Sequence, residues 1–107
     1  MDILEHLPLA PRDLLILVVL AEGPLHGYGL IKAVEERSES GVLLDPANLY
    51  RVLKRMRSLG WLAESESDKE RRRVHAITEH GTELLQAELD RLDRLLAQAR
   101  PALAQGK

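Results

Sequence analysis

Basic and hydrogen-bonding side chains recur at helical spacing in residues 45–59, DPANLYRVLKRMRSL. At about 100° per residue, a helix over this segment has one apolar side and one basic side. The outward side chains are Ala47, Asn48, Arg51, Lys54, Arg55 and Ser58, with Tyr50 on the flank. Guanidinium, ammonium and amide groups arranged in this way bind phosphates and pair with base edges, which is the chemistry of a DNA contact. An ordinary amphipathic surface helix has the same pattern, so the neighbouring segments must distinguish the two.

A second basic cluster follows, formed by Lys69, Arg71, Arg72 and Arg73. Segments 61–67 and 72–77 alternate in polarity and are separated by a polar turn, which predicts a two-stranded hairpin. A solvated run of charge is the alternative. A basic hairpin directly after a basic helix is typical of a winged helix, whose wing contacts the DNA backbone without reading much sequence.

The distribution of charge supports a local basic patch, although the net charge is −2. Residues 46–75 hold eight of the fifteen Lys and Arg residues but only four of the seventeen acids. The remainder of the chain is therefore acidic, which disfavours other orientations on DNA. A concentrated basic patch, more than the overall charge, indicates a nucleic-acid footprint.

Two helices are predicted before the basic one. Residues 11–22 are apolar nearly all round from 14 to 21, so in this small domain we expect a second subunit to cover part of the helix. Residues 27–37 form the next helix, where Gly27 and Gly29 are expected to permit close backbone approach. This helix and the basic helix after it have the order of a helix-turn-helix.

A last helix is predicted after Thr78, which is a good N-cap residue. Its apolar residues are spaced alternately by four and three, a heptad seam that favours a homodimer. The predicted dimer interface comprises Leu14, Leu17, Val18, Leu85, Leu89, Leu92 and Leu96. Glu88 is expected to point outward, and Pro101 to kink or end the helix near Ala99. Packing of the seam on the chain's own first helix is the alternative.

Composition excludes several kinds of chemistry. The chain has no Cys, which excludes disulfides, thiolate metal sites and Cys nucleophiles. Its four His residues lack metal-ligand spacing, and no nucleophile adjoins a base in a recognisable motif. We therefore expect neither an enzyme nor a metal or cofactor site. His26 is interpreted as a hydrogen-bonding residue at a helix start, and His75 as a solvent-facing strand residue.

The length of 107 residues suits one domain. The longest apolar run, residues 14–21, is far shorter than the roughly 20 residues that span a bilayer. No signal peptide is recognised before it. These features predict a cytoplasmic protein without a membrane partner.

Three segments together resemble the PadR family of bacterial transcriptional regulators. They are LLILVVLAEGPLHGYGLIKAVEERS (14–38), DPANLYRVLKRMRSLGWL (45–62) and RRRVHAITEHG (71–81), the last followed by LLQAEL. The resemblance covers roughly residues 11–97, and the pieces GPLHGYGL and LYRVLKRM are specific in combination. The short C-terminal region looks like the compact branch of the family, which has a single terminal helix.

The resemblance and the patterns predict a mainly α fold with a small β-hairpin. A winged helix-turn-helix domain occupies residues 1–77, with the recognition helix at about 46–59 and the wing at about 61–77. A dimerisation helix follows at 78–100, and 101–107 form a tail. The resemblance implies a homodimeric repressor that binds a palindromic operator in double-stranded DNA. A winged helix that contacts only proteins, without specific DNA binding, is the alternative.

Several residues carry this functional prediction. Tyr50, Arg51 and Lys54 match positions that face DNA in family members, and residues 71–73 match the wing. The predicted DNA-binding residues are Asn48, Tyr50, Arg51, Lys54, Arg55, Lys69, Arg71, Arg72 and Arg73. The sequence departs from the family where the helix opens with Asp-Pro-Ala-Asn, since Ser or Thr is frequent there.

Trp61 is a second departure from the family pattern, because a smaller aliphatic residue is usual at its position. It is therefore the candidate residue for a small-molecule effector pocket between the terminal helices. A fully packed dimer core is the alternative.

Overall fold

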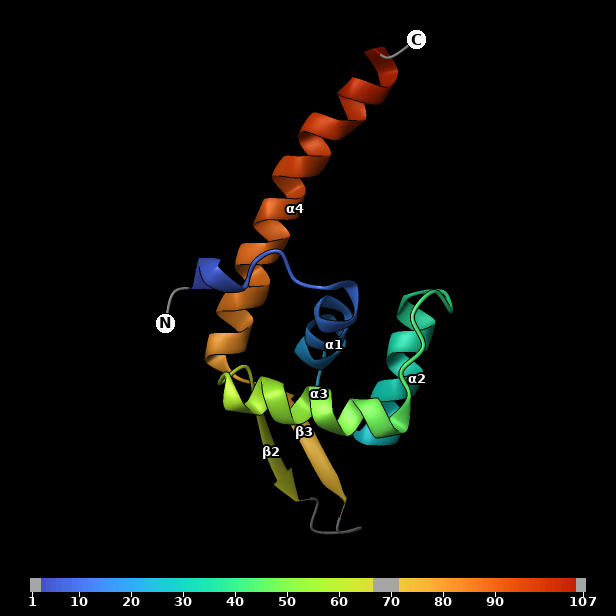
Figure 1. The fold of residues 1–107 in the computed structure, drawn as a ribbon, viewed down its shortest axis with the longest axis vertical. Helices are drawn as coiled ribbons and strands as arrows, with labels where there is room; N and C mark the ends of the chain where they lie inside the picture. The colour runs from blue at the N-terminus through green and yellow to red at the C-terminus, as the bar shows by residue number, and fades with distance from the viewer. Residues whose placement is uncertain (1–2, 67–71, 106–107) are drawn as a thin grey trace.

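The computed structural model describes residues 3–66 and 72–105 of the chain. Helices α1, α2 and α3 form a body from which the long helix α4 projects, and the molecule measures 57 × 33 × 21 Å (Figure 1). In chain order the elements are η1 (Ile3–His6), α1 (Pro11–Ala21), β1 (Leu25–His26), α2 (Gly27–Arg37), α3 (Pro46–Ser58), β2 (Leu62–Glu66), β3 (Arg73–Ile77) and α4 (Glu79–Gln105). The fold is mainly helical with a small sheet, as the sequence predicts.

Local signals explain where the first three helices begin and end. Pro11 and Pro46 stand at the first positions of α1 and α3, where the missing N–H costs no hydrogen bond. Gly23 and Gly60 follow the helices with φ of 154° and 82°, which favour glycine. Asp45 occupies the N-cap of α3, but its side chain makes no capping hydrogen bond. The predicted helix bounds are therefore confirmed to within a residue.

The sheet has three antiparallel strands in the order β1-β3-β2. Strands β2 and β3 form the predicted hairpin, in register from Leu62 opposite Ile77 to Glu66 opposite Arg73. Strand β1 pairs on the other edge of β3, with Leu25 opposite His75. The sequence did not predict β1, because a strand of two residues is too short for alternation to be recognised.

The core lies where α1, α2, α3 and the start of α4 meet. Its fully covered side chains include Ile16, Leu17, Leu30, Met56, Trp61 and Leu84. A Cβ added at Gly81 would lie 2.2 Å from the backbone oxygen of Trp61, so this glycine lets α4 start directly against the core. At Gly27 and Gly29 the nearest atoms would be 3.9 Å and 3.5 Å away, which are ordinary contacts. The predicted close approach at those two glycines is wrong.

Helix α4 begins at a side-chain cap and passes through a proline. Thr78 Oγ1 accepts a hydrogen bond from the backbone N–H of Gly81 at 3.0 Å, which confirms the predicted N-cap. The prediction that Pro101 ends the helix is wrong, because α4 continues to Gln105. This part of the helix is exposed, so water can replace the hydrogen bond that proline lacks. The surrounding Ala, Leu and Gln residues also favour helix.

Glu88 joins the N-terminal arm to α4. Its side chain is 1% exposed and accepts a hydrogen bond from the backbone N–H of Leu9 at 2.8 Å. Arg91 donates to the same carboxylate at 2.6 Å and 3.1 Å. The prediction that Glu88 points outward is therefore wrong: the side chain is buried because the arm folds over this face of α4 and supplies a donor.

Candidate nucleic-acid interface

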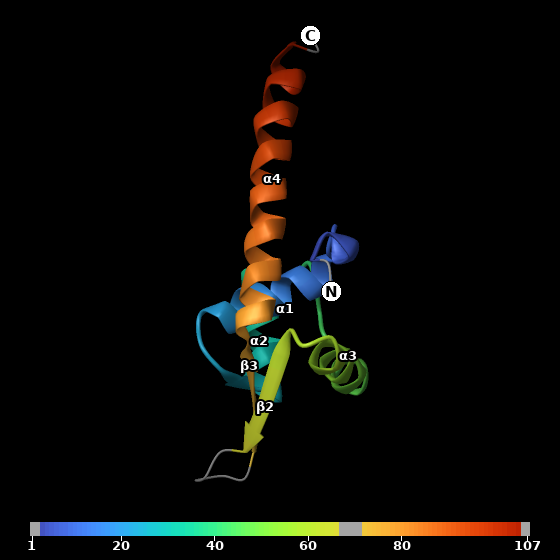
Figure 2. The ribbon, with the colours of Figure 1, turned by 90° about the vertical axis from the view of Figure 1, so that its left-hand side faces the viewer.

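Helix α3 presents a polar face to solvent at the end of the body opposite the projecting end of α4 (Figures 1 and 2). Its apolar side is buried through Leu49, Val52, Leu53 and Met56. Tyr50, which is 67% exposed, Arg51 and Lys54 lie on the solvent side. The amphipathic split predicted from the sequence is present, and the polar face is available for a partner.

Arg51 and Asn48 are linked on this face. Nη2 of Arg51 donates to Oδ1 of Asn48 at 2.6 Å, one helical turn away, and both residues are exposed. A guanidinium group held at one edge keeps its other N–H groups free to donate, and such a fork matches the O6 and N7 acceptors of guanine. The pair therefore forms a preorganised donor group in the first half of α3.

Arg55 is directed toward α1. Its Nη2 lies 2.5 Å from Oδ2 of Asp13, whose side chain is only 8% exposed, and its guanidinium carbon lies 5.6 Å from the centre of the Trp61 ring. Nε of Arg12 lies 3.4 Å from the other oxygen of Asp13. A nearly buried carboxylate requires such partners. Arg55 thus fixes α3 on α1, a role that the sequence did not reveal.

The wing is tied to α3 through Glu64 of β2. Its carboxylate lies 2.9 Å from Nη1 of Arg57 on α3 and 2.6 Å from Nη1 of Arg73 on β3. The two guanidinium groups thus share one carboxylate, which sets the orientation of the hairpin relative to α3. Sequence reasoning missed Glu64, because the polarity of a strand residue does not identify its partner on another element.

His75 lies beside this group and is buried. Its side chain is 7% exposed, and Nδ1 lies 3.9 Å from Glu64. Burial lowers the pKa of His75, with Glu64 opposing this and Arg57 and Arg73 adding to it. The prediction that His75 faces solvent is wrong, because its strand β3 is central in the sheet and is covered by neighbouring elements.

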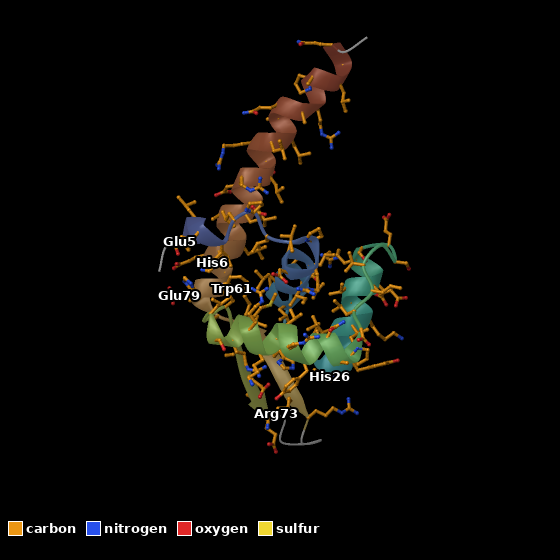
Figure 3. All side chains as sticks on the ribbon, viewed as in Figure 1. Glu5, His6, His26, Trp61, Arg73 and Glu79 are labelled. Carbon is orange, nitrogen blue, oxygen red and sulfur yellow. The ribbon has the colours of Figure 1, made fainter. Side chains whose placement is uncertain are left out.

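The remaining wing residues differ in position. Arg72 is exposed, and its Nη1 lies 3.1 Å from Nε2 of His26. Nδ1 of His26 accepts from the backbone N–H of Gly29 at 3.2 Å, which confirms the predicted helix-start role of His26. Lys69 and Arg71, also predicted to bind DNA, lie outside the described residues. In Figure 3, His26 and Arg73 lie on the same side of the molecule as α3.

Two cavities adjoin the polar face of α3 and the wing. One of about 300 Å³ is lined by Arg12, Asn48, Arg51, Val52 and Arg55. The other, of about 440 Å³, is lined by His26, Gly27, Tyr28, Arg72, Arg73 and His75. Both are rich in hydrogen-bond donors, and no acidic side chain lines either of them among the residues that the structure describes, so both suit anionic groups.

Trp61 is packed in the core. It is 2% exposed, and its ring makes an edge contact with His6, with ring centres 5.3 Å apart. The two residues are labelled side by side in Figure 3. A ligand beside Trp61 would have to displace a neighbour such as His6, so Trp61 acts here as a core residue.

The predicted dimer residues fall into three groups by their exposure in the single chain. Leu17 and Leu85 are 0% and 6% exposed and pack in the chain's own core, so the single chain leaves almost none of their surface to a partner. Leu89 and Leu96 are 39% and 47% exposed on α4. Leu14, Val18 and Leu92 are half-buried. An apolar strip with Leu95 and Leu103 thus faces solvent along the projecting helix.

A helix-turn-helix followed by an antiparallel hairpin, with basic side chains exposed on both, defines a winged helix-turn-helix DNA-binding protein. The family model described as "Transcriptional regulator PadR-like family" matches residues 16–87. The chain belongs to this family. It is accordingly a DNA-binding transcriptional regulator and not an enzyme.

Known proteins resemble the chain in fold or in sequence. A PadR family transcription regulator from Clostridium difficile R20291 has the same fold, with a TM-score of 0.75 and 23% identity over 88% of this chain and 99% of that one. Bacillus subtilis PadR, solved in complex with operator DNA, matches with a TM-score of 0.65 and 21% identity. This match covers 77% of this chain and 47% of that one. An uncharacterised 37.1 kDa protein in transposon TN4556 of Streptomyces fradiae is 39% identical over 83 residues. The alignment with it spans 78% of this chain and 23% of that protein.

The described part of the chain includes no helix that is both long enough and apolar enough to cross a membrane.

Proposed function

We propose that the protein represses transcription as a homodimer that binds a palindromic operator in double-stranded DNA. The observation that carries the proposal is the placement of Tyr50, Arg51 and Lys54 on the exposed face of α3, beside an exposed basic wing. In a winged helix-turn-helix this face enters the major groove, and the wing lies against the backbone. The proposal implies the cytoplasm as the compartment.

The base contacts are assigned to the start and middle of α3. Arg51, with Asn48 attached at 2.6 Å, donates to guanine, and Lys54 reaches a base edge or a phosphate. Tyr50 donates its hydroxyl to a phosphate. Arg72 and Arg73 supply backbone contacts, joined by Lys69 and Arg71. Arg55 acts mainly through Asp13 and reaches at most a neighbouring phosphate.

The second subunit is assigned to the exposed strip of α4. Leu89, Leu96 and Leu103 are 39%, 47% and 78% exposed and recur along the predicted heptad seam of one helix, so they form an apolar strip that a partner helix can cover. Two such helices packed together would cover these leucines and fix two copies of α3 at a set spacing. Two recognition helices about 34 Å apart meet successive major grooves on one side of the duplex.

A small-molecule inducer completes the proposal. It would act where α1 packs against α4, because a shift between these helices would change the spacing of the two recognition helices. A ligand there must open the packed surroundings of Trp61, so binding should quench or shift its fluorescence. Tryptophan fluorescence is specific in this chain because Trp61 is the only tryptophan.

Selection from a random duplex library tests the proposal. The purified protein should enrich a palindromic sequence, and its affinity for that duplex should fall steeply with salt as phosphate contacts are screened. A shuffled duplex of equal length and composition is the control. Absent or salt-insensitive binding would overturn the proposal in favour of a winged helix that contacts only proteins.

A further inference from the structure

The carboxylate of Glu64 is surrounded by three basic side chains. Its Oε1 lies 2.6 Å from Nη1 of Arg73, within the hairpin, and its Oε2 lies 2.9 Å from Nη1 of Arg57 on α3. Nδ1 of His75 lies 3.9 Å from the same Oε2. The oxygen that joins the hairpin to α3 is therefore also the oxygen nearest to the His75 ring.

Nδ1 of His75 is buried and has no hydrogen-bond partner among the residues that the structure describes. Its separation of 3.9 Å from Glu64 is too long for a hydrogen bond. A buried polar atom without a partner is uncommon in folded proteins. A proton added to the ring would make Nδ1 a charged donor beside a carboxylate, and a movement of about 1 Å would bring the two atoms to hydrogen-bond distance.

The surroundings of His75 keep its ring neutral near pH 7. Burial lowers the pKa of His75, Glu64 opposes this, and Arg57 and Arg73 lower it further. The other titratable side chains beside it line the cavity of about 440 Å³ and are His26, Tyr28 and Arg72. Helix α1 also packs on β3, but its two charged side chains belong to the ion pairs of Asp13. The ring therefore gains its proton as the pH falls below 6.5.

Protonation of His75 would change the partner of Oε2. The charged ring would compete with Arg57 for this oxygen, and the two cations would repel each other at short range. Glu64 and His75 lie directly opposite each other in the ladder between β2 and β3, so a bond between them stays within the hairpin. The bond lost is the one to α3, which packs beside β2 (Figures 1 and 2).

We propose that His75 and Glu64 form a pH-dependent switch that releases the β2–β3 hairpin from α3 when His75 is protonated. This inference rests on the proposed function, in which α3 and the hairpin contact one duplex together. At neutral pH the operator meets a preformed surface. In acid only a fraction of the molecules have the two elements in the binding orientation, which lowers the apparent affinity by that fraction.

The first measurement compares the selected operator with a shuffled duplex from about pH 7.5 to about pH 5, the range in which histidine titrates. The ratio of the two affinities is the quantity to follow, because charging of the other histidines strengthens binding to both duplexes alike. The ratio should fall roughly tenfold in acid, a usual size for coupling between two sites. A ratio that falls only where circular dichroism shows loss of helix would overturn the switch.

Three variants assign the change to the Glu64 group. His75→Gln removes the titrating ring, so its ratio should not depend on pH. Arg57→Gln removes the contact that the proton breaks, so its ratio should already be low at neutral pH and change little in acid. His80→Gln is the matched control, because His80 lies at the start of α4 beside Gly60, and it should behave as wild type. The same fall of the ratio in wild type and His75→Gln would exclude the switch.

The pKa of the His75 ring, measured by NMR in both DNA complexes, tests the switch in the unaltered protein. Proton binding and operator binding are linked, so a proton that weakens operator binding must itself bind less tightly in the operator complex. The pKa of His75 should be about one unit lower in the operator complex than in the shuffled complex, which corresponds to the tenfold change. An equal or higher pKa in the operator complex overturns the switch, whether or not the variants fold.

The failure of the switch can be told apart from the failure of the proposed function. A wild type that prefers its operator by the same ratio at every pH overturns the switch and leaves the proposed function standing. A wild type that does not distinguish the two duplexes at neutral pH overturns the proposed function and the switch with it.

Discussion

Nη1 of Arg57 lies 2.9 Å from Oε2 of Glu64, and this contact joins α3 to β2, the first strand of the hairpin. The Arg57 and Glu64 side chains are 23% and 17% exposed, so water screens the pair less than it screens a surface ion pair. Arg73 binds the other oxygen of the same carboxylate. The two parts of the molecule that are proposed to contact DNA are therefore held in one relative orientation in the free protein.

His75, beside Glu64, should make folding stability depend on pH. Because the pKa of His75 is lowered in the folded protein from 6.5, the unfolded chain binds a proton first as the pH falls. Stability should therefore be full above the unfolded pKa of about 6.5 and decrease below it, until the folded pKa is passed. Urea unfolding of wild type and His75→Gln, from about pH 7.5 to about pH 5, measures the difference.

The quantity to compare is the slope of the unfolding free energy with pH. The absolute unfolding free energy is not compared, because the substitution itself can change it. The other histidines are present in both proteins and cancel in the comparison. The wild type should lose more stability than His75→Gln over this range. Parallel curves for the two proteins would contradict the burial of a neutral His75.

Gly81→Ala should destabilise the protein by about 1–3 kcal/mol, the usual cost of overpacking. The added Cβ would lie 2.2 Å from the Trp61 backbone oxygen, and that oxygen also accepts hydrogen bonds from Thr78. Gly27→Ala is the control, since its Cβ would first meet Leu49 at 3.9 Å. Thermal unfolding of both variants measures the effect, and equal melting temperatures would show that α4 can shift away from Trp61.

Leu96→Glu should weaken the proposed dimer. The side chain is 47% exposed in the single chain, so the substitution leaves the core intact but places a charge in the proposed helix pair. We expect the dimer dissociation constant to rise at least about tenfold, or about 1.4 kcal/mol. Sedimentation equilibrium measures it. Gln98→Glu adds the same charge off the seam and should remain dimeric; a dimeric Leu96→Glu would exclude this strip as the interface.

Local patterns in the sequence predicted most of the fold. The apolar spacing of α3, with Pro46 and Gly60 at its ends, gave its bounds and its buried face. These signals are local, because propensity and periodicity act over one or two turns. The N-cap of α4 at Thr78 was also predicted from a local signal, its residue type. Strand β1 was missed because its two residues form a strand only through pairing with β3.

Buried polar residues could not be predicted from local patterns. Glu88 accepts from Leu9, 79 residues away in the chain, and Asp13 pairs with Arg55 across 42 residues. From the local sequence, a carboxylate on a helix is predicted to face solvent, because its partner is distant in the chain and cannot be identified. For the same reason Arg55 was counted with the DNA-facing residues, although it also fixes α3 to α1.

The central claim is that α3 reads the bases of the operator. The consensus DNA sequence that the Arg51→Ala variant selects from a random library tests this claim most directly. If Arg51 reads a base from the exposed face of α3, the variant should bind the wild-type operator more weakly by about 1–3 kcal/mol and lose its preference at one base pair in each half-site. Its preference elsewhere should be retained. Selection from the same random duplex library, followed by titration, measures both. An unchanged consensus with unchanged affinity would contradict the assignment of α3 as the recognition helix.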